Sequence, residues 1–337
     1  SSSQDIAELK VEVDRQLKKA INYNKLTGSI DVDDKVIVNM TAVDLDLGSG
    51  GYGFVCSNLT KKEFREDGPG HIMKLRYTPY QHSCLSVEEE ASPHHETLKR
   101  TDTIDGLPVI ACGLHSQLLP VAATIKKLKP NTKVAYIMTD GGALPAAFSR
   151  TVAWLKQTDY IAATITAGQA FGGDLEAVNI YSALAAAKAV VKADIAIVAM
   201  RPGIVGTGTP LGHTGIEQTQ IINAAASLKE RPIAVLRISQ KDARDRHQGI
   251  SHHTLSALSL SLAPAIIPVP ELTGELLSIA EIVARQIENN RLADRHEIQT
   301  IDSAPTLSEL RRIKEEGGPT ATTMGRGISE EPAFFLA

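Results

Sequence analysis

From Leu107 onward, the sequence alternates short apolar runs with longer segments in which apolar residues recur at the period of an α-helix. A strand that is apolar on both sides is buried on both faces, so this alternation predicts a parallel β-sheet with helices packed on each face. We therefore expect an α/β domain with a Rossmann-like, doubly wound sheet. A TIM barrel is the alternative, although six or seven strand candidates over about 200 residues fall short of the eight that a barrel needs.

The expected elements of this domain, over residues 107–316, follow from the positions of the apolar residues. The strand candidates are LPVIACGL, KVAYIMTD, YIAATITAG, IAIVAM, IAVLRIS and AIIPVP. The apolar stripes that predict helices are Leu144, Phe148, Val152 and Leu155; Leu175, Val178, Tyr181 and Leu184; and Leu272, Leu276, Ile279, Val283 and Ile287.

The first 90 residues follow a different pattern. Short runs of strand-forming residues are separated by the turn-forming clusters DVDD, GSGG and EDGPG, without a long helical period between them. This pattern predicts a separate, small, barrel-like β domain of about five strands over residues 1–90, followed by a linker at 91–106. A tail over residues 317–337 ends in PAFFLA, and we expect it to be ordered because burying two Phe side chains favours folding.

Composition and charge exclude several classes of function. The formal net charge is −4, so the chain lacks the basic surplus of a nucleic-acid-binding protein, and we expect no nucleic acid as a partner. No apolar run reaches the roughly 18 residues of a transmembrane helix, so we expect no membrane segment. The cysteines Cys56, Cys84 and Cys112 form no CxxC pair, which is typical of a reducing cytoplasm and argues against a zinc ribbon.

Glycines and polar residues concentrate in the loops that follow the expected strands, whereas the helix-to-strand loops KPNT, QTD, VKAD and KERP are plain. In open parallel sheets, ligands bind beyond the carboxyl ends of the strands. This asymmetry therefore predicts a ligand site at that edge. The loops concerned contain His115-Ser116-Gln117, Asp140-Gly141-Gly142, AGQAFGGDLE, RPGIVGTGTPLGHTGIEQ and QKDARDRHQGISHH.

The residue types in these loops favour a small anionic ligand, such as a phosphorylated molecule. Glycines let backbone N–H groups approach an anion, and Arg side chains bind phosphate or carboxylate. The candidate ligand-binding residues are His115, Gly141, Gly142, Gly206, Gly208, Arg244 and Arg246. The candidate catalytic residues, as acids, bases or metal ligands, are Asp140, Asp174, His213 and His252.

These motifs also have structural explanations. Asp140 and Asp174 could cap helices, Thr214 with Glu217 matches a capping box, and the charged loop near Arg244 could be solvated. The GTGT segment lacks the lysine of a Walker A loop and the glycine spacing of a dinucleotide-binding loop. The glycines around it could therefore make room for a ligand or for a neighbouring part of the protein.

A metal site is a further alternative. His115, Asp140, His213 and His252 could converge on a divalent metal although they are distant in the sequence. Asp174 and His253 are further possible ligands, whereas no cysteine is expected to bind the metal. No other cofactor can be assigned, and no Ser or Cys lies in a recognised nucleophile motif.

Several long segments resemble a bacterial protein family. Through them the chain is identified as a member of the family catalogued as domain of unknown function 3866, and the resemblance runs over essentially the whole chain. The family implies no particular activity. The segments are LGSGGYGFVCSNL, GPGHIMKLRYTP, SPHHE, GLHSQLLPVAA, AYIMTDGGALPAAFSR, TITAGQAFGGDLEAVN, GIVGTGTPLGHTGIEQ, ISHHTLSAL and TMGRGISEEPAFFLA.

From the residues we expect an enzyme that acts on a small anionic molecule at the carboxyl edge of the sheet, with hydrolysis or group transfer favoured over hydride transfer. The alternative is a non-catalytic protein whose α/β domain senses a metabolite and whose β domain binds a partner. A homodimer is a further expectation, since the C-terminal phenylalanines could cover a partner's surface.

Overall fold

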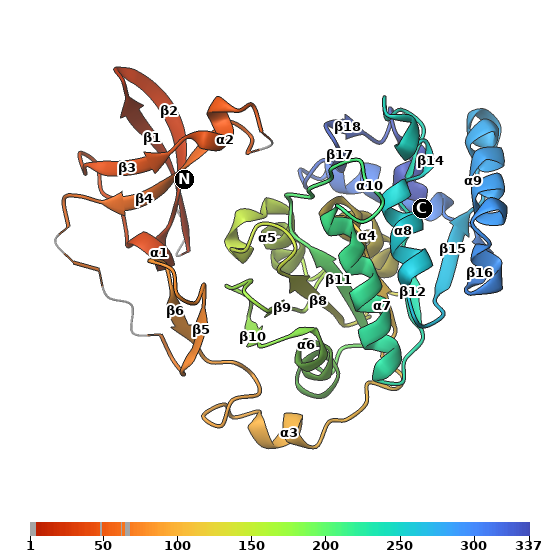
Figure 1. Cartoon of the computed structure of the whole chain (residues 1–337), viewed down its shortest axis with the longest axis horizontal. Helices are drawn as coiled ribbons and strands as arrows, with labels where there is room; N and C mark the ends of the chain where they lie inside the picture. Colours follow the sequence, from red (N-terminus) through yellow and green to blue (C-terminus); the bar gives the residue numbers. More distant parts are fainter. Residues whose placement is uncertain (1–4, 48, 62, 65–67) are drawn as a thin grey trace.

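The computed structural model describes residues 5–47, 49–61, 63–64 and 68–337. It contains a small N-terminal sheet and a large sheet that is flanked by helices (Figure 1). The large sheet has eight strands that are all parallel, as expected for a doubly wound α/β fold.

The N-terminal sheet has four strands in the order β1-β2-β4-β3 and, within the described residues, shares no strand with the large sheet. The domain boundary at residue 90 stays a prediction. β1 and β2 form an antiparallel hairpin, whereas β2 and β4 run parallel. A second hairpin, β5–β6, follows. The elements are β1 (Ile6–Val13), β2 (Gln16–Tyr23), α1 (Asn24–Thr27), β3 (Val36–Asn39), α2 (Thr41–Asp44), β4 (Tyr52–Asn58), β5 (Ile72–Lys74), β6 (His82–Cys84) and α3 (His95–Lys99).

The large sheet has the order β10-β9-β8-β11-β7-β12-β15-β16. Its central strands are buried on both faces; all six residues of β8 are buried. This burial explains why the strands are continuously apolar. The strands are β7 (Val109–Ala111), β8 (Val134–Thr139), β9 (Ala163–Ala167), β10 (Leu175–Ala177), β11 (Ile195–Met200), β12 (Pro232–Ala234), β15 (Ile266–Pro270) and β16 (Glu297–Ile301).

Helices cover both faces of this sheet, and each face has its own hydrophobic core. One core contains α6, α7 and α9, and the other contains α4, α5, α10 and α11. The helices are α4 (Leu118–Leu128), α5 (Arg150–Gln157), α6 (Ile180–Ala186), which η3 (Ala187–Val191) continues, α7 (Glu217–Ser227), α8 (His252–Leu260), α9 (Leu277–Asn289), α10 (Ala304–Glu315) and α11 (Pro332–Leu336). Short strand pairs are β13 (Ile238–Ser239) with β14 (Gly249–Ile250), and β17 (Thr322–Thr323) with β18 (Arg326–Gly327).

The strand order creates a switch point at the centre of the sheet. β7 and β11 are neighbours, but α4, which follows β7, packs on one face, whereas α7, which follows β11, packs on the other. The chain therefore leaves these two strands in opposite directions, and a crevice opens between their following loops. Crevices of this kind are where doubly wound sheets bind ligands.

Two helical stripes of the sequence analysis differ from the observed elements. The stripe that begins at Leu175 predicts one helix, but residues 175–177 form strand β10, and the helix begins only at Ile180, after the N-cap Asn179. The stripe that begins at Leu144 is divided, since α5 begins at Arg150 and is capped by the Ser149 hydroxyl. Local turn and cap residues override the apolar period in both places.

The C-terminal residues PAFFLA are ordered, as expected, and form α11. Phe334 and Phe335 are 2% and 1% exposed and lie in the core on the α4 side of the sheet. The buried carboxylate of Glu331 fixes the start of this segment: it accepts hydrogen bonds from Ser239 and from the N–H of Gln240, and it pairs with Arg326 at 2.6 Å. The two phenylalanines therefore cover a surface of their own chain.

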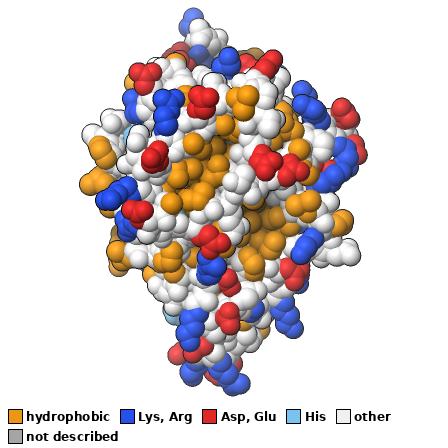
Figure 2. Space-filling model, turned by 90° about the vertical axis from the view of Figure 1, so that its right-hand side faces the viewer, with side chains coloured by type: hydrophobic (Ala, Val, Ile, Leu, Met, Phe, Trp, Pro, Cys, Tyr) orange, Lys and Arg blue, Asp and Glu red, His pale blue; other side chains and the backbone are white. Residues whose placement is uncertain are grey.

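The end of the molecule that carries α9 and the edge strand β16 has apolar side chains at its surface. Figure 2 shows them gathered in hollows between charged residues. Leu277 of α9 is 56% exposed. The expected homodimer stays a prediction.

Candidate functional site

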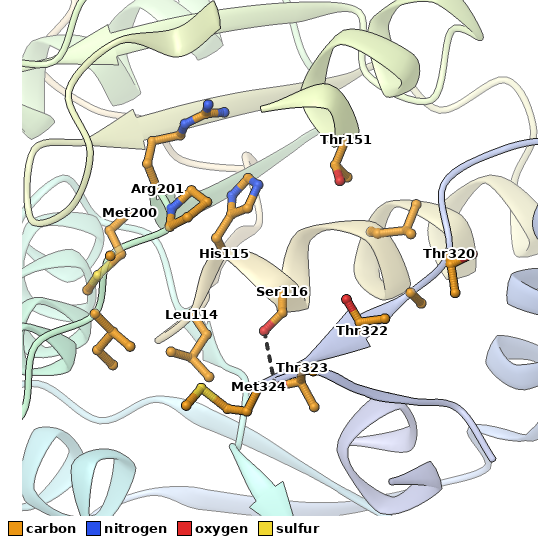
Figure 3. A pocket seen from close by; sticks show the side chains of 16 residues that line it. Leu114, His115, Ser116, Thr151, Met200, Arg201, Thr320, Thr322, Thr323 and Met324 are labelled. Atoms are coloured by element: carbon orange, nitrogen blue, oxygen red, sulfur yellow. Dashed lines mark hydrogen bonds between the residues drawn. The ribbon is translucent and has the colours of Figure 1, made fainter. Parts of the chain in front are cut away.

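A cavity of about 580 Å³ lies at the switch point between β7 and β11. Its walls come from residues 114–116 after β7, residues 200–204 after β11, Thr151 of α5 and the C-terminal segment 320–325 (Figure 3). Cavities of this volume hold small metabolites. The expected ligand site at the carboxyl edge of the sheet therefore has a physical counterpart in this cavity.

Arg201, in the wall of this cavity, directly follows β11 and is 1% exposed. Its Nη2 is 3.5 Å from the carbonyl oxygen of Pro145, while Nε and Nη1 are buried without a hydrogen-bond partner in the described chain. Burial lowers the pKa of Arg201 to about 10, so the guanidinium is still charged at neutral pH. A buried charge without a counter-ion is costly, which makes this residue the most unusual one at the edge.

The N-terminal sheet lies next to Arg201. The charge of Arg201 acts on Tyr23, at the end of β2, and on Tyr136 of β8, although burial raises the pKa of both phenols. Tyr23 stacks on Phe54 with ring centroids 6.0 Å apart, and Phe54 in turn contacts Phe148 of the large domain. These rings thus connect the N-terminal sheet with the large domain.

His115 stands beside Arg201 in the cavity wall (Figure 3). Burial, helped by the charge of Arg201, lowers the pKa of His115 to about 3, so the ring is neutral. Its Nε2 is 3.0 Å from the hydroxyl of Ser149, which itself accepts the N–H of Val152. We infer that Ser149 donates to Nε2 and that the ring proton is on Nδ1, an atom with no partner among the described residues.

Glu217 lies at the start of α7, next to the loop that follows β8. Burial raises the pKa of Glu217 to about 7, and the charge of Asp140 adds to this effect. Its Oε2 occupies the space that a side chain at Gly141 would need, and the carbonyl of Arg201 does the same at Gly142. The two glycines therefore admit protein neighbours, and Glu217 is poised to exchange a proton near neutral pH.

Asp140 and Asp174 lie at different ends of the sheet. Asp140 follows β8 at the carboxyl edge, and its carboxylate accepts the N–H of Gln169 at 2.9 Å. Asp174 lies level with the beginning of β9, where it accepts the N–H and the hydroxyl of Thr164 and pairs with Lys156. The structure thus places Asp174 away from the cavity, in a role that ties β9 to β10.

The glycine-rich loop at 203–212 uses many of its backbone donors internally. The N–H of Val205 donates to the Thr214 hydroxyl at 3.0 Å, and the N–H of Thr207 donates to the carbonyl of Gly212 at 2.9 Å. The N–H of Gly212 donates to the Thr209 hydroxyl at 3.0 Å. Fewer backbone N–H groups are therefore left to bind an anion than the sequence suggests. The role of Gly206 and Gly208 in ligand binding stays a prediction.

Two glycines of this region lie against a group of histidine rings. A Cβ on Gly206 would lie 2.9 Å from the ring of His253, and a Cβ on Gly215 would lie 3.3 Å from Nδ1 of His213. Gly208 has a φ of +80° and faces the guanidinium of Arg246. The bare backbone therefore makes room for side chains of the protein itself.

We call His213, His247, His252 and His253 the histidine cluster. The rings of His213 and His253 stack with centroids 4.0 Å apart, and four further ring pairs of the cluster have centroids 4.3 to 5.8 Å apart. Three of the candidate metal ligands of the sequence analysis, His213, His252 and His253, lie together in this cluster. His115 and Asp140 are not part of it. His247 takes part instead.

Charged residues surround the histidine cluster. Asp242 pairs with the buried Arg237 at 3.4 Å and with Arg244 at 2.9 Å, and the Arg244 guanidinium holds the pKa of this carboxyl well below its usual range. Arg244 is thus tied to Asp242, while Arg246 faces the glycine-rich loop. Neither arginine lines the cavity that contains Arg201.

Sequence reasoning did not single out Arg201, Glu217 as an acid, or His247. The first two had a signal in the sequence: each lies where a strand ends or a helix begins at the ligand-binding edge. His247 lies in a loop with seven other charged or imidazole side chains, and only its burial, at 1% exposure, distinguishes it.

Within the described chain, no helix is both long enough and apolar enough to cross a membrane. No match was found among the curated proteins or among the solved structures. The family described as "Protein of unknown function (DUF3866)" matches residues 19–337, which is nearly the whole sequence. The chain with this switch-point cavity and histidine cluster therefore belongs to the DUF3866 family.

Proposed function

We propose that this chain is an enzyme that binds a small anionic molecule in the cavity between β7 and β11 and carries out hydrolysis or group transfer on it. The observation that supports this function best is the buried, unpaired guanidinium of Arg201 in the cavity wall. A protein retains such a charge at a cost, and a bound anion offsets that cost.

The donors around Arg201 favour an oxyanion. Arg201 has only N–H donors, and His115, with its proton on Nδ1, presents a further donor beside it. Phosphate and carboxylate groups carry several acceptor oxygens and can satisfy these donors together. In this proposal the Arg201 side chain turns from Pro145 toward the cavity when an anion binds there.

Glu217 supports chemistry at this edge over binding alone. A carboxyl group with a pKa of about 7 can give or take a proton at neutral pH, and such groups concentrate at catalytic sites. Tyr136 is influenced by both Arg201 and Glu217, which places the cation and the acid around one buried residue. In this proposal Arg201 holds the anionic group and Glu217 transfers the proton.

The first test measures the binding of inorganic phosphate, pyrophosphate and malonate by thermal unfolding and by calorimetry. The second test measures turnover of a panel of phosphate and carboxylate esters. We expect at least one anion to bind wild-type protein and to lose tenfold or more in affinity in Arg201→Met. Arg100→Met, at an exposed position paired with Glu96, is the matched control and should bind like wild type.

Equal affinity in wild type and Arg201→Met would contradict the binding site. Turnover that Glu217→Gln abolishes, with anion binding intact, supports the enzyme. Anion binding without turnover of any ester in the panel would overturn the catalytic part and favour the metabolite sensor.

A further inference from the structure

The histidine cluster has the geometry of a metal centre. His247, His252 and His253 each offer a ring nitrogen, and these three atoms lie within 4.8 Å of one another. In the described part of the chain, no other group of three such side chains meets this criterion. Nitrogen ligands of a tetrahedral zinc ion lie about 2.0 to 2.1 Å from the metal and hence about 3.4 Å apart, so small ring rotations close the remaining gap.

The ring nitrogens of the cluster are short of partners. His213 Nδ1, His252 Nε2 and His253 Nδ1 are buried without a hydrogen bond within the described residues. Three such atoms in one place are uncommon, because an unsatisfied buried polar atom costs free energy.

Other residues orient these rings in the way that metal-binding histidines are usually oriented. Nδ1 of His247 is 2.7 Å from the hydroxyl of Ser251, which leaves Nε2 for a metal. Nε2 of His213 is 3.1 Å from the carbonyl of Pro210 and donates to it, which fixes the ring that stacks on His253. Hydrogen bonds of this kind fix the tautomer and the direction of a ligating ring.

We propose that the histidine cluster binds one Zn²⁺ ion through His247, His252 and His253. Three imidazole ligands suit a first-row transition metal, whereas Mg²⁺ and Ca²⁺ prefer oxygen. The ring of His213 stacks on His253 and holds it in place. Three protein ligands leave the fourth position of the ion open, as in catalytic zinc sites.

The charges near the site are compatible with a dication that binds an anion. Asp242 offsets part of the charge of Arg237 and Arg244, which reduces the electrostatic repulsion between these arginines and a bound metal ion. No carboxylate belongs to the ligand set among the described residues, so bound Zn²⁺ keeps its full charge. This charge, with Arg246 nearby, favours an anion or hydroxide in the open position.

The metal site is independent of the proposed anion cavity. Leu114 and Ile204 separate the two: they line the cavity on one side and a narrow space against His253 on the other. Loss of one site therefore does not require loss of the other, and the two proposals can fail separately.

The experiment measures Zn²⁺ binding to the metal-free full chain by competition with a chromophoric chelator, and Co²⁺ binding by its visible absorption. We expect one Zn²⁺ per chain, a tetrahedral Co²⁺ spectrum, and no response to Mg²⁺. His252→Asn should weaken Zn²⁺ binding by at least tenfold. His71→Asn is the control, since His71 lies in the N-terminal region with an exposed side chain, and should bind like wild type.

Binding of less than about 0.1 equivalent of Zn²⁺, or equal affinity in His252→Asn and His71→Asn, would overturn the proposal. A response to inorganic phosphate but not to Zn²⁺, lost in His252→Asn, would also overturn it, because the cluster would then be an anion site. Circular dichroism shows whether each variant folds. If His252→Asn does not fold, Co²⁺ absorption of His247→Asn replaces it as the test.

Discussion

Gly206 lies against the imidazole of His253, where a Cβ would be 2.9 Å from both Cε1 and Nε2 of the ring. Real Cβ atoms do not approach other atoms so closely, so any side chain at this position displaces the ring. The glycine-rich loop therefore has a structural partner in the histidine cluster.

Gly206→Ala should weaken Zn²⁺ binding by tenfold or more, because the methyl group pushes His253 out of the ligand set. Gly208→Ala is the comparison within the same loop: it forces a residue with a Cβ to adopt a φ of +80° but meets nothing closer than 3.8 Å. It should cost about 1 kcal/mol of stability and leave Zn²⁺ affinity unchanged. If both variants lose the same affinity, the loop acts through its overall conformation and not through contact with His253.

Arg201→Met should raise the free energy of unfolding by about 1 to 4 kcal/mol while weakening anion binding tenfold or more. The substitution removes a buried charge that has no counter-ion in the described chain and replaces it with an apolar side chain of similar length. Urea unfolding and calorimetric titration with inorganic phosphate measure the two effects. A less stable Arg201→Met protein would mean that the guanidinium is already neutralised in the folded chain.

Glu217→Gln should change how stability depends on pH. The pKa of Glu217 is raised from 4.5 to about 7 in the folded protein, so the folded state binds the proton more tightly than the unfolded state. The tighter proton binding stabilises the folded state. This stabilisation is fully present below pH 4.5 and is lost as the pH rises to about 7. The variant avoids this loss and should therefore be more stable relative to wild type at pH 8 than at pH 4. Thermal unfolding at several pH values measures the difference, and a pH-independent difference would contradict it.

Phe335→Ala should lower the free energy of unfolding by about 3 to 5 kcal/mol, since it removes a fully buried ring from the core next to α4. Tyr77→Ala removes a ring that is 96% exposed and should change stability by less than about 0.5 kcal/mol. Urea unfolding of both variants is the measurement. Nearly equal values would show that the C-terminal segment detaches in solution.

The alternation of apolar and amphipathic segments was enough to predict the parallel sheet and the edge at which its polar loops meet. It could not predict that β11 lies between β7 and β8, because strand pairing depends on contacts between distant residues. The local pattern also misassigned residues 175–177, which have helical spacing but pair with β9.

Site residues could be predicted only where their type was informative. His213 and His252 were candidates, and the structure brings them together with His253 and His247. A single Arg after an apolar strand, in contrast, is ordinary in a sequence. What makes Arg201 unusual is burial without a counter-ion, and that depends on the three-dimensional packing of Tyr23 and Tyr136 around it.

The central position of β11 also has a consequence for how the chain folds. β7 and β8 are consecutive strands of the large sheet, yet they do not pair with each other. β8 can pair with β9, but β7 is joined to β8 only through β11, which begins more than fifty residues after β8 ends. Forming such distant pairs costs loop-closure entropy before any pairing energy is gained, which slows folding. Arg201 directly follows β11. Its charge is therefore removed from water only when β11 takes its place in the sheet, late in folding.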